Sequence, residues 1–208
     1  MDVLDRNGRL VTRFVVDVDP AEAKAALGML SALKLRVDKW QPKTRYNRAE
    51  LALKWSSIAR LGQDIKDIEL ARNMNLESRV FDSDGYTLRQ GKMTDPYTGK
   101  PLVFNQVNNK NDRQIDLDHV VALADAFVSG GYRWTQGGYS WTNLYNDPGN
   151  LLAVATQTNQ QKGSKHAGLW LPRPEFCRRF VIMQIQIKSR YHLSVTESEA
   201  ATMVRILS

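Results

Sequence analysis

Four polar residues in the C-terminal half of the chain are of the types that can activate a water molecule and bind a metal ion. Asp118 and His119 are adjacent at the end of the run IDLDH, and Asn150 and Asn159 flank a second apolar run, LLAV. A neutral imidazole is basic enough near physiological pH to take a proton from water. Carboxylate and amide oxygens suit a hard divalent cation. The four residues therefore form a candidate hydrolytic site.

Two strands and a helix must bring these residues together. The residues of IDLDH at 115–119 and the compact apolar residues at 151–154 predict short strands. The polar segment around residue 159 predicts the first turns of a short helix. The order along the chain is strand, loop, strand, helix.

This order resembles the ββα metal finger of the HNH nuclease superfamily, with His119, Asn150 and Asn159 as its first, middle and last motif residues. The resemblance is closest to the branch of bacterial secreted nuclease-like proteins and the C-terminal domains of Gmr-type modification-dependent restriction enzymes. It rests on the segments TRYNRAELALKW, TDPYTGKPL, IDLDHVVALADAF, NDPGNLLAV, NQQKG and LWLP. It implies an α+β fold with a ββα-metal core, flanking helices and a small β hairpin. Residues 41–208 would be the nuclease domain, and residues 1–40 a β/α extension.

The resemblance implies a metal-dependent endonuclease that hydrolyses phosphodiester bonds, in DNA rather than RNA. His119 would act as the general base, and Asn150 would hold its ring by accepting a hydrogen bond from the distal N–H. Asp118 and Asn159 would hold a divalent cation, Mg²⁺ or Mn²⁺. Asp116 is either a second carboxylate for the metal or a residue that flanks the strand.

Most of these side chains also have a structural alternative. Asn150 could cap a turn and Asn159 could cap a helix. His166 could contact a phosphate or a metal, although a surface position is the simpler interpretation, and His192 is interpreted as a surface residue.

The formal net charge of +7 indicates an anionic partner such as nucleic acid. Residues 31–60 carry much of it, with eight basic and two acidic residues. Within this segment Arg45 and Arg48 are candidate phosphate contacts, and after the catalytic run Lys162 and Lys165 are others.

Three aromatic residues, Trp40, Tyr46 and Trp55, are interleaved with the cations of residues 31–60. Such a mixture can contact phosphates while its rings stack or pack nearby. The alternative is a solvated helix face whose aromatic rings turn into the core.

Cysteine is represented only by Cys177, which excludes an internal disulfide, and no paired CxxC motif is present. We therefore expect no structural zinc. No stretch approaches membrane-spanning length, and the first residues lack a secretory signal. These features predict a cytoplasmic protein without a membrane partner, while secretion or delivery stays open.

Turn and capping residues predict the flanking elements. Asp19 and Pro20 predict the start of a helix that runs towards Leu35. The predicted remainder is a hairpin turn at Asn7–Gly8, turns at DSDG and DPYTG, an amphipathic helix from Pro174 and a last helix capped by Thr196 and Glu199.

Two other functions fit the same residues. One is a module that binds nucleic acid without cleaving it, inside a larger defence assembly. The other is a nuclease toxin held by an acidic immunity protein, which a basic surface would permit.

Overall fold

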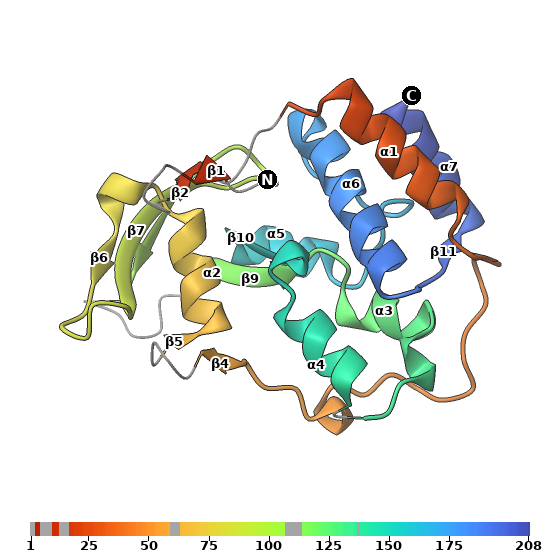
Figure 1. Cartoon of the computed structure of the whole chain (residues 1–208), viewed down its shortest axis with the longest axis horizontal. Helices are drawn as coiled ribbons and strands as arrows, with labels where there is room; N and C mark the ends of the chain where they lie inside the picture. Colours follow the sequence, from red (N-terminus) through yellow and green to blue (C-terminus); the bar gives the residue numbers. More distant parts are fainter. Residues whose placement is uncertain (1–2, 5–9, 13–16, 59–62, 107–113, 137) are drawn as a thin grey trace.

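An antiparallel pair of strands, β9 (Ile115–His119) and β10 (Leu151–Ala155), here called the central hairpin, lies at the centre of the molecule (Figure 1). The segment between the two strands contains helices, so the prediction of a loop there was wrong. The structure is a computed structural model, and it describes residues 3–4, 10–12, 17–58, 63–106, 114–136 and 138–208. The chain contains both helices and strands, which confirms the predicted mixture of α and β structure.

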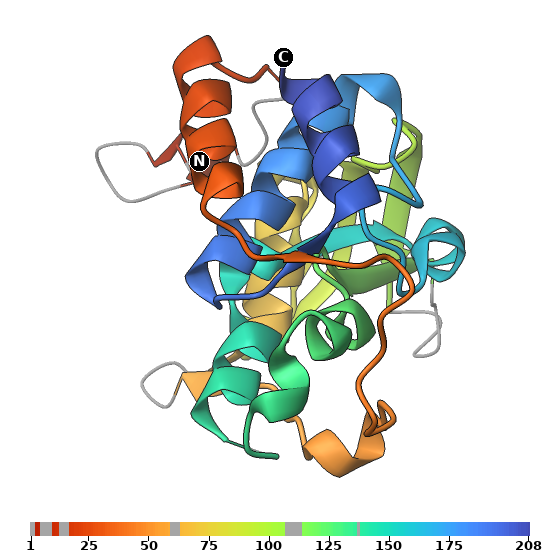
Figure 2. The same cartoon turned by 90° about the vertical axis from the view of Figure 1, so that its right-hand side faces the viewer.

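Three helices cover one side of the central hairpin. They are α1 (Pro20–Ser31), α6 (Pro174–Arg190) and α7 (Glu197–Leu207), and Figure 2 shows them lying side by side. Their apolar faces share one core with Leu152 and Val154 of β10. The N-terminal helix is thus packed into the same core as the C-terminal helices. A short parallel pairing of β3 (Leu35–Arg36) with β11 (Val195–Thr196) joins the same regions.

A second core lies on the other side of the central hairpin. It is formed by helix α2 (Ile65–Asn73) and an antiparallel sheet in the order β6 (Val80–Phe81), β7 (Leu88–Thr94), β8 (Pro101–Asn105). Ala153 faces this core, while its neighbours in β10 face the first one. Because successive side chains of a strand point to opposite faces, β10 has to be apolar throughout.

The remaining elements are short. Helix α3 (Leu123–Val128) and helix α4 (Tyr139–Asn146) share a third, aromatic-rich core, and helix α5 (Thr156–Lys162) follows β10 directly. The other antiparallel pairs are β1 (Val3–Leu4) with β2 (Leu10–Thr12) and β4 (Ser57–Ile58) with β5 (Gln63–Asp64). The predicted hairpin turn at Asn7–Gly8 lies outside the described residues.

Capping residues set several helix ends as predicted. The Asp19 carboxylate accepts from the Ala21 amide at 2.7 Å, and Thr196 and Glu199 form a reciprocal capping box. The first helix nevertheless ends at Ser31, four residues before the predicted Leu35, because Leu35 pairs with β11 instead.

A group of charged side chains, here called the interior charge cluster, is sealed between α3, α6 and α7. The Lys188 ammonium lies 2.9 Å from Asp125 and 2.7 Å from Glu199, and Arg36 lies 3.4 Å from Asp125. His166 borders this cluster, is buried and accepts from the Gly168 amide at 3.1 Å. The prediction of a surface position for His166 was therefore wrong, whereas His192 is exposed as predicted.

The basic segment does not form the solvated helix face that was one of the two alternatives considered from the sequence. Its described residues from 32 to 58 contain short strands and one 3-10 turn rather than an α-helix, so the proposed helix face was wrong. Lys39, Lys43 and Lys54 are exposed, but Arg36 belongs to the interior charge cluster. The segment therefore presents part of its charge to solvent and buries part of it.

Candidate active site

The end of β9 positions the two central residues. In the register of the central hairpin, Asp118 pairs with Leu152 and His119 with Leu151, so the two side chains point to opposite faces. Both are buried, with 5% and 7% of their surface exposed, yet both line one cleft.

Asp118 is held by two buried partners. One of its oxygens accepts from the Lys162 ammonium at 2.9 Å, and the other accepts from the Tyr97 hydroxyl at 2.6 Å. Burial raises the pKa of the Asp118 carboxyl, while Lys162 and the Tyr97 hydroxyl favour the charged form. The carboxylate is thus fixed in orientation beneath the cleft.

Lys162 was predicted to contact a phosphate, and the structure contradicts this. Its side chain is fully buried at the end of α5, and its ammonium also donates to the His119 carbonyl at 2.9 Å. It lies one helical turn after Asn159, as the spacing predicted, but that face points into the protein. Lys162 therefore positions the backbone of His119 and the side chain of Asp118.

Tyr97 is supplied by the predicted DPYTG turn. The Asp95 side chain accepts from the Tyr97 amide at 3.1 Å and from the Thr98 hydroxyl at 2.6 Å, and Gly99 closes the turn with φ of 76°. The turn drives the Tyr97 ring into the core, where it packs edge-on against Phe180. Its buried hydroxyl then needs an acceptor, and Asp118 provides one.

His119 has a defined tautomer. Its Nε2 lies 2.9 Å from the Tyr145 carbonyl oxygen, which can only accept, so Nε2 carries the proton. The other nitrogen, Nδ1, has no hydrogen-bond partner among the described residues and keeps its lone pair in the neutral ring. The imidazole packs against Tyr145, with ring centroids 4.9 Å apart, and lies 6.0 Å from Trp55, which also packs on Tyr145 at 4.4 Å.

This packing determines the charge state of the ring. The pKa of His119 is lowered to about 4, chiefly by burial and to a smaller extent by the nearby Arg48 and Lys162 charges, while the hydrogen bond to Tyr145 acts in the opposite direction. His119 is therefore neutral at physiological pH and able to accept a proton.

Asn150 does not accept a hydrogen bond from the imidazole, so this prediction was wrong. It ends the 3-10 turn Pro148–Asn150, and its side chain accepts from the Val121 amide at 2.7 Å and donates to the Val121 carbonyl at 3.3 Å. It also reaches the Leu144 carbonyl at 3.5 Å. The hydrogen bond from the His119 ring goes to the Tyr145 carbonyl oxygen instead. Asn150 instead fastens the segment after His119 to the helix that carries Tyr145.

Asn159 lies inside α5 and does not cap the helix. Its amide nitrogen donates to Asp116 at 3.3 Å, and its carbonyl oxygen has no partner among the described residues. Asp116 and Asp118 share one face of β9, so three oxygen-bearing side chains gather beside the cleft. This donor set fits a hard cation such as Mg²⁺ or Mn²⁺. Within the described ranges, no group of three or more His, Cys, Asp or Glu side chains forms a metal site by itself.

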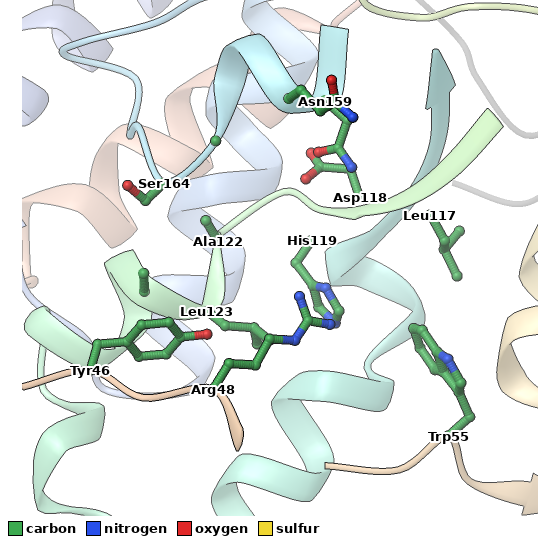
Figure 3. A pocket seen from close by; sticks show the side chains of 13 residues that line it. Tyr46, Arg48, Trp55, Leu117, Asp118, His119, Ala122, Leu123, Asn159 and Ser164 are labelled. Atoms are coloured by element: carbon green, nitrogen blue, oxygen red, sulfur yellow. The ribbon is translucent and has the colours of Figure 1, made fainter. Parts of the chain in front are cut away.

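The cleft has a volume of about 310 Å³, within the range of small-molecule sites. Figure 3 shows Asp118 and Asn159 on one side and Tyr46, Arg48 and Trp55 on the other, with His119 between them. Arg48 is exposed and lines the cleft, as a phosphate contact must.

The other two predicted phosphate contacts lie outside the cleft lining. Arg45 is exposed and borders a different pocket. Lys165 is exposed just beyond Ser164, which lines the cleft, and it donates to the Gln161 carbonyl.

Sequence reasoning missed two contributors to the site. Tyr97 was visible as an aromatic residue inside a recognised turn, and a buried tyrosine hydroxyl regularly seeks a polar partner. Tyr145 acts through its main-chain carbonyl, which every residue type possesses, so no sequence signal could have identified it.

Comparisons with known proteins yield one partial match. A protein of the fungus Arthroderma benhamiae, described as an uncharacterized secreted protein, is 36% identical over 98 residues, which cover 45% of this chain. The match spans 47% of that relative's length, or about half of it. No family model matches the chain, and no solved structure matches it.

None of the helices in the described part of the chain is long and apolar enough to cross a membrane. The expected cytoplasmic location finds no support in the relative, whose description is that of a secreted protein.

Proposed function

We propose that the protein is a metal-dependent endonuclease of the HNH type that hydrolyses phosphodiester bonds. The observation that carries the proposal is the state of His119. One ring nitrogen is fixed on a carbonyl and the other has no partner among the residues that the structure describes, in a cleft bordered by oxygen ligands and by Arg48. The succession of β9, β10 and α5 supports the assignment to the ββα-metal class.

His119 would act as the general base through Nδ1. Because Nε2 carries the proton, Nδ1 is the nitrogen able to accept one from an attacking water. The Tyr145 carbonyl stabilises the imidazolium that forms, since its oxygen continues to accept from Nε2–H. Tyr145, with Trp55 packed on it, orients the imidazole ring and covers part of its surface.

Asp118 and Asn159 would hold the divalent cation, with Asp116 as a further carboxylate beside them. When bound, the cation would neutralise charge that develops on the phosphate and on the leaving oxygen. Lys162 and Tyr97 orient Asp118, and Asn159 is oriented by its hydrogen bond to Asp116.

Arg48 would bind the phosphate that undergoes attack. Its exposed guanidinium lines the cleft near His119. The two side chains are close enough for the positive charge of Arg48 to lower the pKa of the imidazole. A guanidinium forms paired hydrogen bonds with phosphate oxygens. DNA is the substrate that we favour over RNA, following the resemblance to DNA-cleaving nucleases.

We also propose that the protein acts outside the cell that makes it. The support is the secreted description of the partial relative, which shares 36% of 98 residues with this chain.

The test is cleavage of supercoiled plasmid by purified protein with Mg²⁺ or Mn²⁺, with and without EDTA. We expect metal-dependent nicking, abolished by EDTA and reduced by about 10²- to 10⁴-fold in His119→Ala. His192→Ala, which changes an exposed histidine outside the cleft, should match the wild type. Equal cleavage by His119→Ala and wild type would eliminate His119 as the base.

Metal binding is tested separately by the concentration of Mn²⁺ that gives half-maximal cleavage. Asn159→Ala should raise this concentration about 10- to 100-fold, while Gln161→Ala, an exposed neighbour in α5, should leave it unchanged. Binding of DNA without cleavage at any metal concentration would instead identify a non-cleaving module.

A further inference from the structure

A second, smaller pocket lies behind the catalytic cleft. Four aromatic residues line it, Phe127, Tyr132, Trp134 and Trp141, with Arg45 and Glu50 at its polar side. We call it the aromatic pocket. Neither the hydrolytic residues nor the phosphate contact of the proposed function uses it.

The two cavities share one wall. In the segment 44–48, Tyr46 and Arg48 line the cleft, whereas Arg45 and Asn47 line the aromatic pocket. Tyr46 packs edge-on against Phe127, with ring centroids 5.6 Å apart, so this contact separates the two cavities. A polymer bound in the cleft therefore has to cross only this wall to reach the pocket.

The size and lining of the pocket fit a flat heterocycle. The pocket has a volume of about 50 Å³. This is about one sixth of the 310 Å³ of the cleft, so the pocket accepts a single small group rather than a stretch of chain. That is room for one small ring. Aromatic side chains bind such rings by stacking, whatever the base.

We propose that the aromatic pocket binds an unpaired pyrimidine base of the nucleic acid strand whose phosphate lies at His119. This inference rests on the proposed nuclease function. A base in a duplex is stacked between its neighbours and reaches such a pocket only after leaving the helix. The protein therefore prefers single-stranded or locally unpaired substrate. Arg45, exposed at the pocket, contacts a phosphate of the same strand.

The test is equilibrium binding measured by tryptophan fluorescence. EDTA is present, so that the result does not depend on hydrolysis. The probes are oligo-dT and an abasic deoxyribose-phosphate chain of equal length and charge. We expect oligo-dT to bind about tenfold more tightly than the abasic chain and to quench fluorescence. Equal affinities of the wild type for the two probes would overturn the proposal, and oligo-dA binding at least as tightly as oligo-dT would overturn the choice of a pyrimidine.

Variants separate the base from the backbone. Trp134→Leu should lower oligo-dT affinity about tenfold and leave abasic-chain affinity unchanged, while Arg45→Ala should weaken both equally. Tyr139→Leu alters an aromatic residue that is 83% exposed and lies outside the pocket, and it should bind as the wild type does. Because Trp134 also packs on Trp141, the thermal unfolding of Trp134→Leu is compared with that of the wild type. Tyr132→Leu, at a second residue of the pocket, should show the same selective loss of oligo-dT affinity.

The two proposals fail in different ways. Selective oligo-dT binding without cleavage at any metal concentration would overturn the nuclease function alone. Metal-dependent cleavage by a protein that binds both probes equally would overturn the aromatic pocket alone.

Discussion

Lys162 and Lys188 are both fully buried cations paired with carboxylates, but they serve different parts of the molecule. Lys188 faces Asp125 and Glu199 within the interior charge cluster, and neither carboxylate lines the cleft. Lys162 faces Asp118, which does line it, and also holds the His119 carbonyl. The same chemistry therefore joins helices in one place and positions reacting groups in the other.

The largest expected effect is on stability, at Lys188. Lys188→Met leaves two carboxylates buried without their principal cation, and removing one partner of a buried ion pair costs about 3–5 kcal/mol. Urea unfolding should reveal a loss of this size. Lys24→Met, at an exposed position of α1, is the control. If both variants unfold alike, the interior charge cluster does not stabilise the fold.

The second effect is on catalysis, at Lys162. Lys162→Met should lower kcat about 10- to 100-fold, because Asp118 and the backbone of His119 lose their shared anchor. Its stability loss should be smaller than that of Lys188→Met, since a single carboxylate is left, and it keeps the Tyr97 hydroxyl. The kcat of Lys162→Met and Lys188→Met is measured by steady-state cleavage, and their free energy of unfolding is measured in urea. A variant that loses stability but keeps full kcat would make Lys162 purely structural.

The difference between the two lysines also marks what sequence can predict. The strands at 115–119 and 151–154, the second of which extends to Ala155, the short helix that carries Asn159 and the capped last helix were predicted because periodicity and caps are local signals. The burial of Lys162 was not, because it depends on which face of α5 meets β9. Nothing local distinguishes a lysine that faces a phosphate from one that faces Asp118.

The role of Asn150 illustrates the same limit. Its position before the second strand was predicted, but its partners were not, because they come from residues 121 and 144. In α7 the cap predicts where the helix begins, but the orientation of the helix places Met203 and Leu207 inward and leaves Val204 46% exposed. Element type is local information, whereas contact partners depend on the whole chain.

A smaller effect is expected at Tyr97, the other partner of Asp118. Tyr97→Phe removes only the hydroxyl and leaves Lys162 in place, so kcat should fall less than in Lys162→Met. The pKa of Asp118 should rise further, because the hydrogen bond from Tyr97 lowers it. The pH profile of cleavage should then move towards higher pH at its acidic side. Tyr139→Phe, at an exposed tyrosine, should leave the profile unchanged.

The smallest effect concerns the pH dependence of His119. Burial lowers its pKa from the ordinary 6.5 to about 4, and only the neutral ring above that value can accept a proton. The free protein determines kcat/KM, which should stay level as pH falls below neutrality and decline only near pH 4. A bound phosphodiester places negative charge beside the imidazole and raises its pKa, so kcat should decline at a higher pH than kcat/KM. An acidic decline of kcat/KM at the ordinary histidine value would mean that the ring is hydrated, contrary to its burial beside Tyr145.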